Sequence, residues 1–222
     1  MASARISKRQ LKEDTFIATT LKAWEYIREN EKKFFIALVA IVCIVALALW
    51  AGYAKKQSRE RASSQFADAL TSFRSGDFKT AEELMAIIAK EHGGTEEGVY
   101  AAYFLGKCNL ETGKYLDAIQ AFDRYLGKSG RHPFFHDAAA EGRAVALANE
   151  HRYVEAGDAY MDLSKKIKTN RFMETEYLKR AAESYRLGNR TEKAIEVLST
   201  LLEKATGTER RDIEVELAIL RG

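Results

Sequence analysis

One stretch of the chain, from Phe34 to Ala54, runs for twenty-one residues without a charged side chain or a proline. An α-helix of this length is about 31 Å long at a rise of about 1.5 Å per residue, close to the roughly 30 Å hydrocarbon core of a bilayer. Lysine pairs flank the stretch, and Trp50 and Tyr53 lie near its end, as is typical of membrane boundaries. The pattern predicts one transmembrane helix over residues 34–54. A buried core helix or a cleaved signal peptide fits less well, because neither needs so long an apolar run.

The residues before this stretch divide into a basic arm and an amphipathic segment. Residues 1–10 are small and basic, whereas apolar residues from Leu11 to Ile27 mostly recur every three to five positions. This spacing is typical of a helix with one apolar face, and we expect that face to lie on the membrane surface. A solvated helix, or one packed on a partner, is the alternative. Five acidic residues before the span argue against a mitochondrial presequence.

After the span, a small residue followed four positions later by a large apolar one occurs four times. The small residues are spaced by 37, 38 and 38 positions and are Ala81, Ala118, Ala156 and Ala194. Each begins a predicted helix that follows a turn. Before the turns we expect four further amphipathic helices, over about residues 57–75, 98–112, 135–150 and 171–187. The repeating unit is therefore a helical hairpin, and a last helix over about residues 208–220 is expected to cap the stack.

The turns between the paired helices contain residues that tolerate unusual backbone angles. Gly76, Gly113 and Gly188 are expected to supply left-handed or helix-cap conformations there.

The second hairpin has the most informative sequence. Leu105 and Gly106 precede Ala118 by about thirteen residues, and Phe122 follows it by four. This arrangement resembles the tetratricopeptide repeat. Where the other hairpins lack the glycine they keep a small residue, which lets two helices approach closely; these residues are Ala69, Ala144 and Ala182. We expect an all-α protein, in which one N-terminal transmembrane helix precedes an α-solenoid of about four such hairpins and a capping helix.

The order of the segments resembles a more specific group. A short arm with a juxtamembrane helix (residues 1–33), one span (34–54) and a repeat domain (55–222) are similar to the membrane-anchored tetratricopeptide-repeat-like proteins of the bacterial inner membrane, whose best-known family is the ancillary subunit of the Sec translocon. The resemblance implies a scaffold that holds secreted or envelope proteins and chaperones near the membrane, through protein–protein contacts.

The charges favour one orientation and exclude one class of partner. Residues 1–33 contain eight Lys and Arg, against four between residues 55 and 61, so the positive-inside rule predicts a cytoplasmic N-terminus and a periplasmic repeat domain. Residues 55–222 contain 27 basic and 27 acidic residues. A neutral domain is a poor binder of phosphate backbones, so we expect no nucleic-acid partner.

No motif in the chain predicts chemistry. His132 and His136 are four residues apart, as two metal ligands on a helix can be, but Pro133 and a missing third ligand weaken that interpretation. The chain has no nucleophile elbow, phosphate-binding glycine loop or metalloprotease motif. We expect no catalytic residues, no metal and no cofactor.

The resemblance implies that the first helix of each hairpin lines a concave groove that binds a peptide or a partner helix. The side chains expected there are Tyr100, Tyr103, Lys107 and Leu110 in the second hairpin and Glu176, Lys179, Glu183 and Arg186 in the fourth. An alternative is that the two tyrosines merely pack between hairpins. Two other functions stay open: a structural assembly factor of envelope or division machinery that self-associates, and an import receptor of a mitochondrial outer membrane.

Overall fold

The structure is a computed structural model that describes residues 28, 31–128, 135–167 and 170–222. Two compact units make up the chain, Met1–Gln57 and Ser58–Gly222. The predicted basic arm, the predicted amphipathic helix over Leu11 to Ile27, and the loop residues His132 and Pro133 lie outside the described residues.

Helix α2 (Glu31–Arg74) contains the predicted span and continues into the second unit. By length and composition it is apolar enough to cross a membrane. Over the predicted span large apolar side chains of this helix are exposed, for example Leu47 by 64%, Leu49 by 70% and Trp50 by 69%. The helix therefore presents an uncovered hydrocarbon surface over the predicted span.

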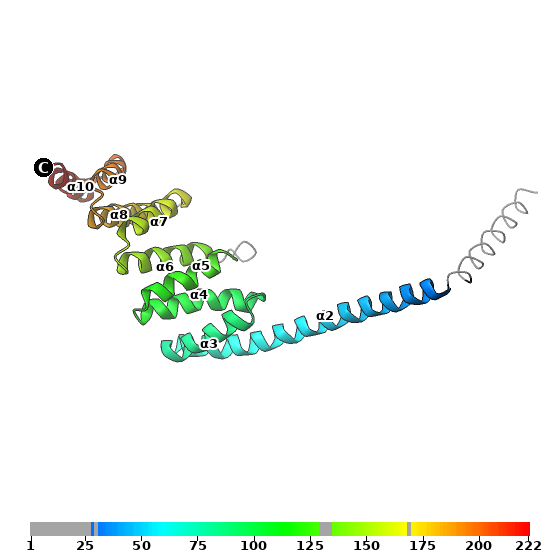
Figure 1. The fold of residues 1–222 in the computed structure, drawn as a ribbon. Coiled ribbons are helices and arrows are strands. Elements are labelled where there is room, and N and C mark those ends of the chain that lie inside the picture. The colour runs from blue at the N-terminus through cyan, green and yellow to red at the C-terminus, as the bar shows by residue number, and fades with distance from the viewer. Residues whose placement is uncertain (1–27, 29–30, 129–134, 168–169) are drawn as a thin grey trace, which may run out of the picture. The chain divides into compact units, whose positions relative to one another are not determined.

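The second unit is built from helical hairpins that follow one another along the chain (Figure 1). Its helices after α2 are α3 (Phe78–Glu91), α4 (Glu96–Glu111), α5 (Tyr115–Leu126), α6 (His136–Asn149), α7 (Tyr153–Lys166), α8 (Arg171–Leu187), α9 (Thr191–Lys204) and α10 (Gly207–Arg221). From α3 onward each helix packs mainly on its neighbours in the chain, and α4 also contacts α6. The described elements are all helical, which confirms the predicted all-α solenoid with its final helix.

The repeat alanines are fully buried in this unit. All four of them, at positions 81, 118, 156 and 194, have no exposed surface. Gly106 is equally constrained, because a Cβ there would lie 2.7 Å from the ring of Phe122. Small residues are thus required where helices approach closely, as the sequence predicted.

Four left-handed backbone positions each lie five residues before a repeat alanine. They are Gly76 (φ 82°), Gly113 (φ 74°), His151 (φ 60°) and Asn189 (φ 54°). Gly188 is a helix C-cap with φ −84°, which agrees with the predicted left-handed or helix-cap conformation, and the left-handed residue of that turn is Asn189. The geometry of the turn requires a left-handed conformation at the fifth position before the alanine. Glycine, or a residue type that tolerates φ > 0, can occur at this position.

Candidate binding groove

Three hollows follow one another along the first helices of the hairpins in the second unit. The first lies between α4 and α6 and is lined by Tyr103, Lys107, Leu110, Glu111, Tyr115, Ala138, Glu141, Gly142, Val145 and Asn149. The second lies between α6 and α8 and is lined by Val145, Ala148, Asn149, Tyr153, Tyr160, Lys179, Arg180, Glu183, Ser184 and Leu187. The third lies between α8 and α10 and is lined by Lys179, Glu183, Leu198, Thr208, Glu209, Asp212, Ile213 and Glu216.

Neighbouring hollows share their lining residues. Val145 and Asn149 line both the first and the second, and Lys179 and Glu183 line both the second and the third. The three hollows therefore adjoin one another over α4, α6, α8 and α10, and we call this row of hollows the groove. Their volumes of 430, 460 and 420 Å³ are in the range of sites that accept side chains of a ligand.

Five of the eight predicted site residues line the groove. Tyr103, Lys107 and Leu110 lie in the first hollow, and Lys179 and Glu183 lie in the second and third. The other three line none of these hollows; they are Tyr100, Glu176 and Arg186.

Tyr103 contributes more to packing than to the groove surface. Its side chain is only 8% exposed and its ring stacks on Phe135, with 4.6 Å between the ring centroids and 10° between the planes. Burial raises the pKa of its hydroxyl. The ring of Tyr100 meets the same Phe135 edge-on at 5.5 Å. These contacts favour the alternative in which both tyrosines pack between hairpins.

Glu176 and Arg186 support the groove from its margin. The Lys179 Nζ lies 3.6 Å from the Glu176 Oε1, and the guanidinium of Arg186 donates two hydrogen bonds to the carboxylate of Glu183, at 2.5 and 2.7 Å. The two margin residues therefore orient two side chains that line the hollows.

The central residues of the groove come from the third hairpin, where the sequence analysis identified no site. Glu141 and Val145 lie fifteen and eleven residues before Ala156, the same offsets that separate Tyr103 and Lys107 from their own repeat alanine. Both line the first hollow. The repeat spacing was the signal that could have identified them.

Polar contacts tie the middle of the groove together. The Tyr177 hydroxyl donates to Glu141 Oε2 at 3.0 Å, and burial followed by the charge of Glu141 raises the pKa of Tyr177 to about 12. Arg180 lies over the ring of Tyr160, 5.8 Å from its centroid, and its Nη1 is 3.9 Å from Glu141 Oε1. These contacts join α6, α7 and α8, so that they help to hold the middle of the groove in one shape.

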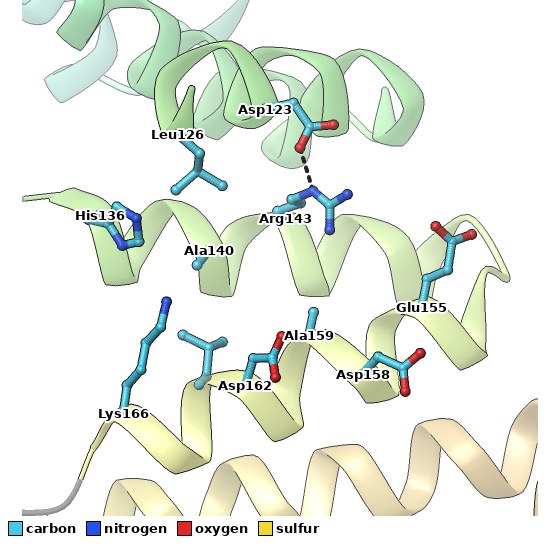
Figure 2. A pocket seen from close by; sticks show the side chains of 11 residues that line it. Asp123, Leu126, His136, Ala140, Arg143, Glu155, Asp158, Ala159, Asp162 and Lys166 are labelled. Atoms are coloured by element: carbon cyan, nitrogen blue, oxygen red, sulfur yellow. Dashed lines mark hydrogen bonds and ion pairs between the residues drawn. The ribbon is translucent and has the colours of Figure 1, made fainter. Parts of the chain in front are cut away.

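Another hollow lies on a different side of the repeats, between α5, α6 and α7 (Figure 2). Three of its charged side chains, on Asp123, Arg143 and Asp158, are engaged with a neighbouring helix. Arg143 Nε donates to Asp123 Oδ1 at 2.5 Å, and Asp158 Oδ1 accepts from the Tyr185 hydroxyl at 2.6 Å and from Lys193 Nζ at 2.9 Å. Because these groups stabilise helix contacts, the groove is the better candidate for binding.

The described part of the chain contains no group of three or more His, Cys, Asp or Glu side chains placed to hold a metal ion. His136 Nδ1 lies 3.4 Å from the neighbouring Asp137 carboxylate, and its predicted partner His132 is outside the described residues.

Comparisons with known proteins agree with the fold. The model of the tetratricopeptide repeat-like domain family matches residues 24–140. Two similar solved structures are those of the nearly identical TPR-like repeats assigned to a kinesin light chain of Podosopora anserina, one of them a variant with a single substitution. Both structures are 18% identical in sequence to this chain, and their TM-scores are 0.54 and 0.53. The matched regions cover 73% of this chain and 86% and 85% of the two solved chains, respectively. Comparison with curated proteins finds no significant match.

Proposed function

Because the chain belongs to the tetratricopeptide repeat-like domain family, whose members generally act as non-enzymatic scaffolds for other proteins, we propose that its groove binds segments of partner proteins. The row of adjoining hollows over α4, α6, α8 and α10 is the observation that carries this proposal. Lys107 offers a charged contact in the first hollow, since it makes no ion pair within the residues that the structure describes.

We further propose that residues 34–54 anchor this scaffold in a lipid bilayer. Large apolar side chains such as Leu47 and Trp50 are exposed. Contact of this apolar surface with water costs free energy, whereas contact with lipid chains does not. Lysines at positions 32, 33, 55 and 56 bound the apolar run and suit the headgroup regions. The proposed division is an arm and juxtamembrane helix over residues 1–33, the anchor, and the repeat domain over residues 55–222.

The location that fits best is the bacterial inner membrane, with the N-terminus in the cytoplasm and the repeats in the periplasm. The excess of basic residues before the span supports this orientation. A scaffold held there would meet secreted and envelope proteins, and their chaperones, near the translocon. Confinement to the membrane raises the effective concentration of partners that share it.

A structural assembly factor that self-associates is the second candidate, and one surface favours it. Val215 and Ile219 are four residues apart on α10 and are 60% and 73% exposed. A second copy that covered them would bury this apolar pair.

Site-specific photocrosslinking in cells tests the groove. A photoreactive phenylalanine analogue replaces Lys107 in one variant and Leu116 in the control, since Leu116 is 52% exposed on α5 and lies outside the groove. We expect crosslinks to other proteins from position 107 and few from position 116. Equal crosslinking from both would contradict the proposal, and a homodimer trapped from position 215 would support self-association.

Cysteine accessibility tests the membrane topology. Cys43 and Cys108 are replaced by alanine, and one cysteine is introduced at Glu203, an exposed position on α9. A membrane-impermeant maleimide should label it in cells whose outer membrane alone is permeabilised. If labelling requires disruption of the inner membrane, the periplasmic assignment is wrong.

A further inference from the structure

The groove changes chemical character between its second and third hollows. Apolar side chains of the second hollow come from three helices, with Val145 and Ala148 on α6, Tyr153 on α7 and Leu187 on α8. Leu187 remains 44% exposed although it lies at the end of a helix in the middle of the solenoid. The second hollow thus presents apolar surface that no side chain of the described residues fully covers.

The third hollow is acidic. Four carboxylates line it, on Glu183, Glu209, Asp212 and Glu216, against the single ammonium of Lys179. That ammonium lies 2.8 Å from Glu209 Oε1, and hydrogen bonding to Glu209 raises its pKa. A cation held in this way shows that the hollow stabilises positive charge.

Two of these carboxylates are open to a cationic partner. The carboxylate of Glu183 forms an ion pair with Arg186, and that of Glu209 forms an ion pair with Lys179. Asp212 and Glu216, in contrast, make no ion pair within 4 Å with any residue in the described ranges, and the charge of Glu216 acts only at longer range on Arg186, whose pKa it helps to raise. The net charge of the side chains that line the hollow is therefore negative, and the carboxylates of Asp212 and Glu216 are accessible to a ligand.

Helix stability does not explain this pair of acids. Asp212 and Glu216 are four residues apart, a spacing at which like charges repel and opposite charges attract. Elsewhere on α10, Arg210 and Glu214 use the same spacing for an ion pair at 3.0 Å. The arrangement works against the helix and suits a positively charged ligand.

We propose that the groove binds a protein segment in which apolar side chains lie next to a run of Lys or Arg, the apolar part in the second hollow and the cations against Asp212 and Glu216 in the third. This inference rests on the proposed function, because it names the chemistry of the segment that the groove would bind. Charge complementarity selects this occupant over an acidic segment, which the open carboxylates would repel.

Synthetic peptides serve as probes for this chemistry. Full-length protein in phosphatidylcholine nanodiscs is titrated against fluorescein-labelled peptides of one common length, and empty nanodiscs correct for lipid binding. One peptide has a block of Leu, Ala and Phe joined to a block of Lys and Arg, made in both chain directions. A second has the same composition with apolar and basic residues alternated, and a third replaces every Lys and Arg by Glu.

In fluorescence anisotropy, we expect the basic block peptide in one direction to bind at least about fivefold more tightly than the alternated one, with an affinity that falls as salt is raised. Equal binding of the block and alternated peptides would overturn the inference, since it would indicate unspecific charge attraction. Tighter binding of the Glu peptide would overturn the charge assignment while leaving peptide binding in the groove intact. If no peptide binds, the inference fails, and the crosslinking from position 107 judges the proposed function separately.

Variants separate binding from folding. Glu216→Lys creates an attractive i,i+4 pair with Asp212, so the melting temperature should stay equal or rise while affinity for the basic block peptide falls about tenfold. Glu192→Gln/Glu203→Gln changes the charge by the same two units on α9, outside the groove, and should leave affinity within about twofold. Leu187→Ser should weaken binding, whereas Leu116→Ser on α5 should not. Unchanged affinity in Glu216→Lys would overturn the proposal.

Discussion

Replacement of Gly142 by alanine should destabilise the repeat unit through a ring that cannot move aside. A Cβ at position 142 on α6 would lie 2.6 Å from Phe122 Cζ and 2.9 Å from its Cε2. The same ring lies 2.7 Å from the Cβ position of Gly106 on α4. Phe122 has no exposed surface, so a glycine on each of two helices makes room for one fully buried ring.

The expected cost follows from two opposing effects. Extra atoms in a packed core cost about 1–3 kcal/mol, and the confinement of Phe122 by both glycines places Gly142→Ala in the upper part of that range. Alanine regains about 1 kcal/mol over glycine inside a helix. The net loss in the free energy of unfolding should therefore be about 1–2 kcal/mol.

Circular dichroism of the full chain in detergent measures this loss. For a unit of about 150–250 residues, 1 kcal/mol shifts the melting temperature by about 2–4 °C, so the variant should melt about 2–8 °C lower. Gly94→Ala is the matched control, because nothing lies within 4 Å of its Cβ position and its φ is not left-handed. The control should not melt lower than the wild type.

A double-mutant cycle tests the physical cause. Phe122→Leu removes the ring atoms that the new methyl group would meet, so Gly142→Ala should cost about 0.5 kcal/mol less, or even stabilise, in that background. Strict additivity of the two changes, or an unchanged melting temperature in Gly142→Ala alone, would refute the packing argument.

Three further predictions rest on single positions. His151→Gly should stabilise the unit by about 0.5–1 kcal/mol, because a left-handed φ of 60° costs a histidine more than a glycine, and His151→Ala should bring no such gain in a thermal melt. Tyr185→Phe removes the hydroxyl that, together with Lys193, holds the pKa of Asp158 below its ordinary value of 3.8. Because that folded-state pKa is depressed, the stabilisation is present above about pH 4 and is lost as pH falls through the folded pKa. Denaturation at pH 7 should therefore show a loss of about 0.5–1.5 kcal/mol that shrinks towards pH 2, and a pH-independent loss would contradict this origin. Burial leaves Cys108 without exposed surface and raises its pKa to about 11, so iodoacetamide should modify it only after unfolding, as mass spectrometry would show; rapid modification of the native protein would contradict it.

The sequence by itself determined the features that depend on local pattern. The apolar run over residues 34–54 identifies a helix long enough to span a membrane, because length and composition alone decide that property. The spacing of 37 and 38 residues between the repeat alanines predicted the hairpins, because each hairpin buries its alanine at the same place in the repeat. Within each helix, the apolar residues recur with the helical period and mark the face that is buried. The same alanines have no exposed surface in the structure.

The sequence predicted part of the lining of the candidate groove. Lys107, Lys179 and Glu183 line its hollows, since a repeat register carries the position of a groove-facing side chain from one hairpin to another. Tyr103 also lines the first hollow, but the sequence did not show that Phe135 stacks on its ring, because periodicity shows only that a ring faces a neighbour. The sequence did not single out Asn189 as the left-handed residue of the last turn, since residue type marks a turn but not its exact register.

Only the tertiary structure decided which charges meet. Lys179 and Glu209 are thirty residues apart and pair at 2.8 Å, and the hollow that they line leaves Asp212 and Glu216 without an ion pair among the described residues. A periodic pattern describes one helix at a time. The chemistry of the groove arises between helices, where the packing of α8 on α9 and of α9 on α10 brings side chains from distant positions to one surface.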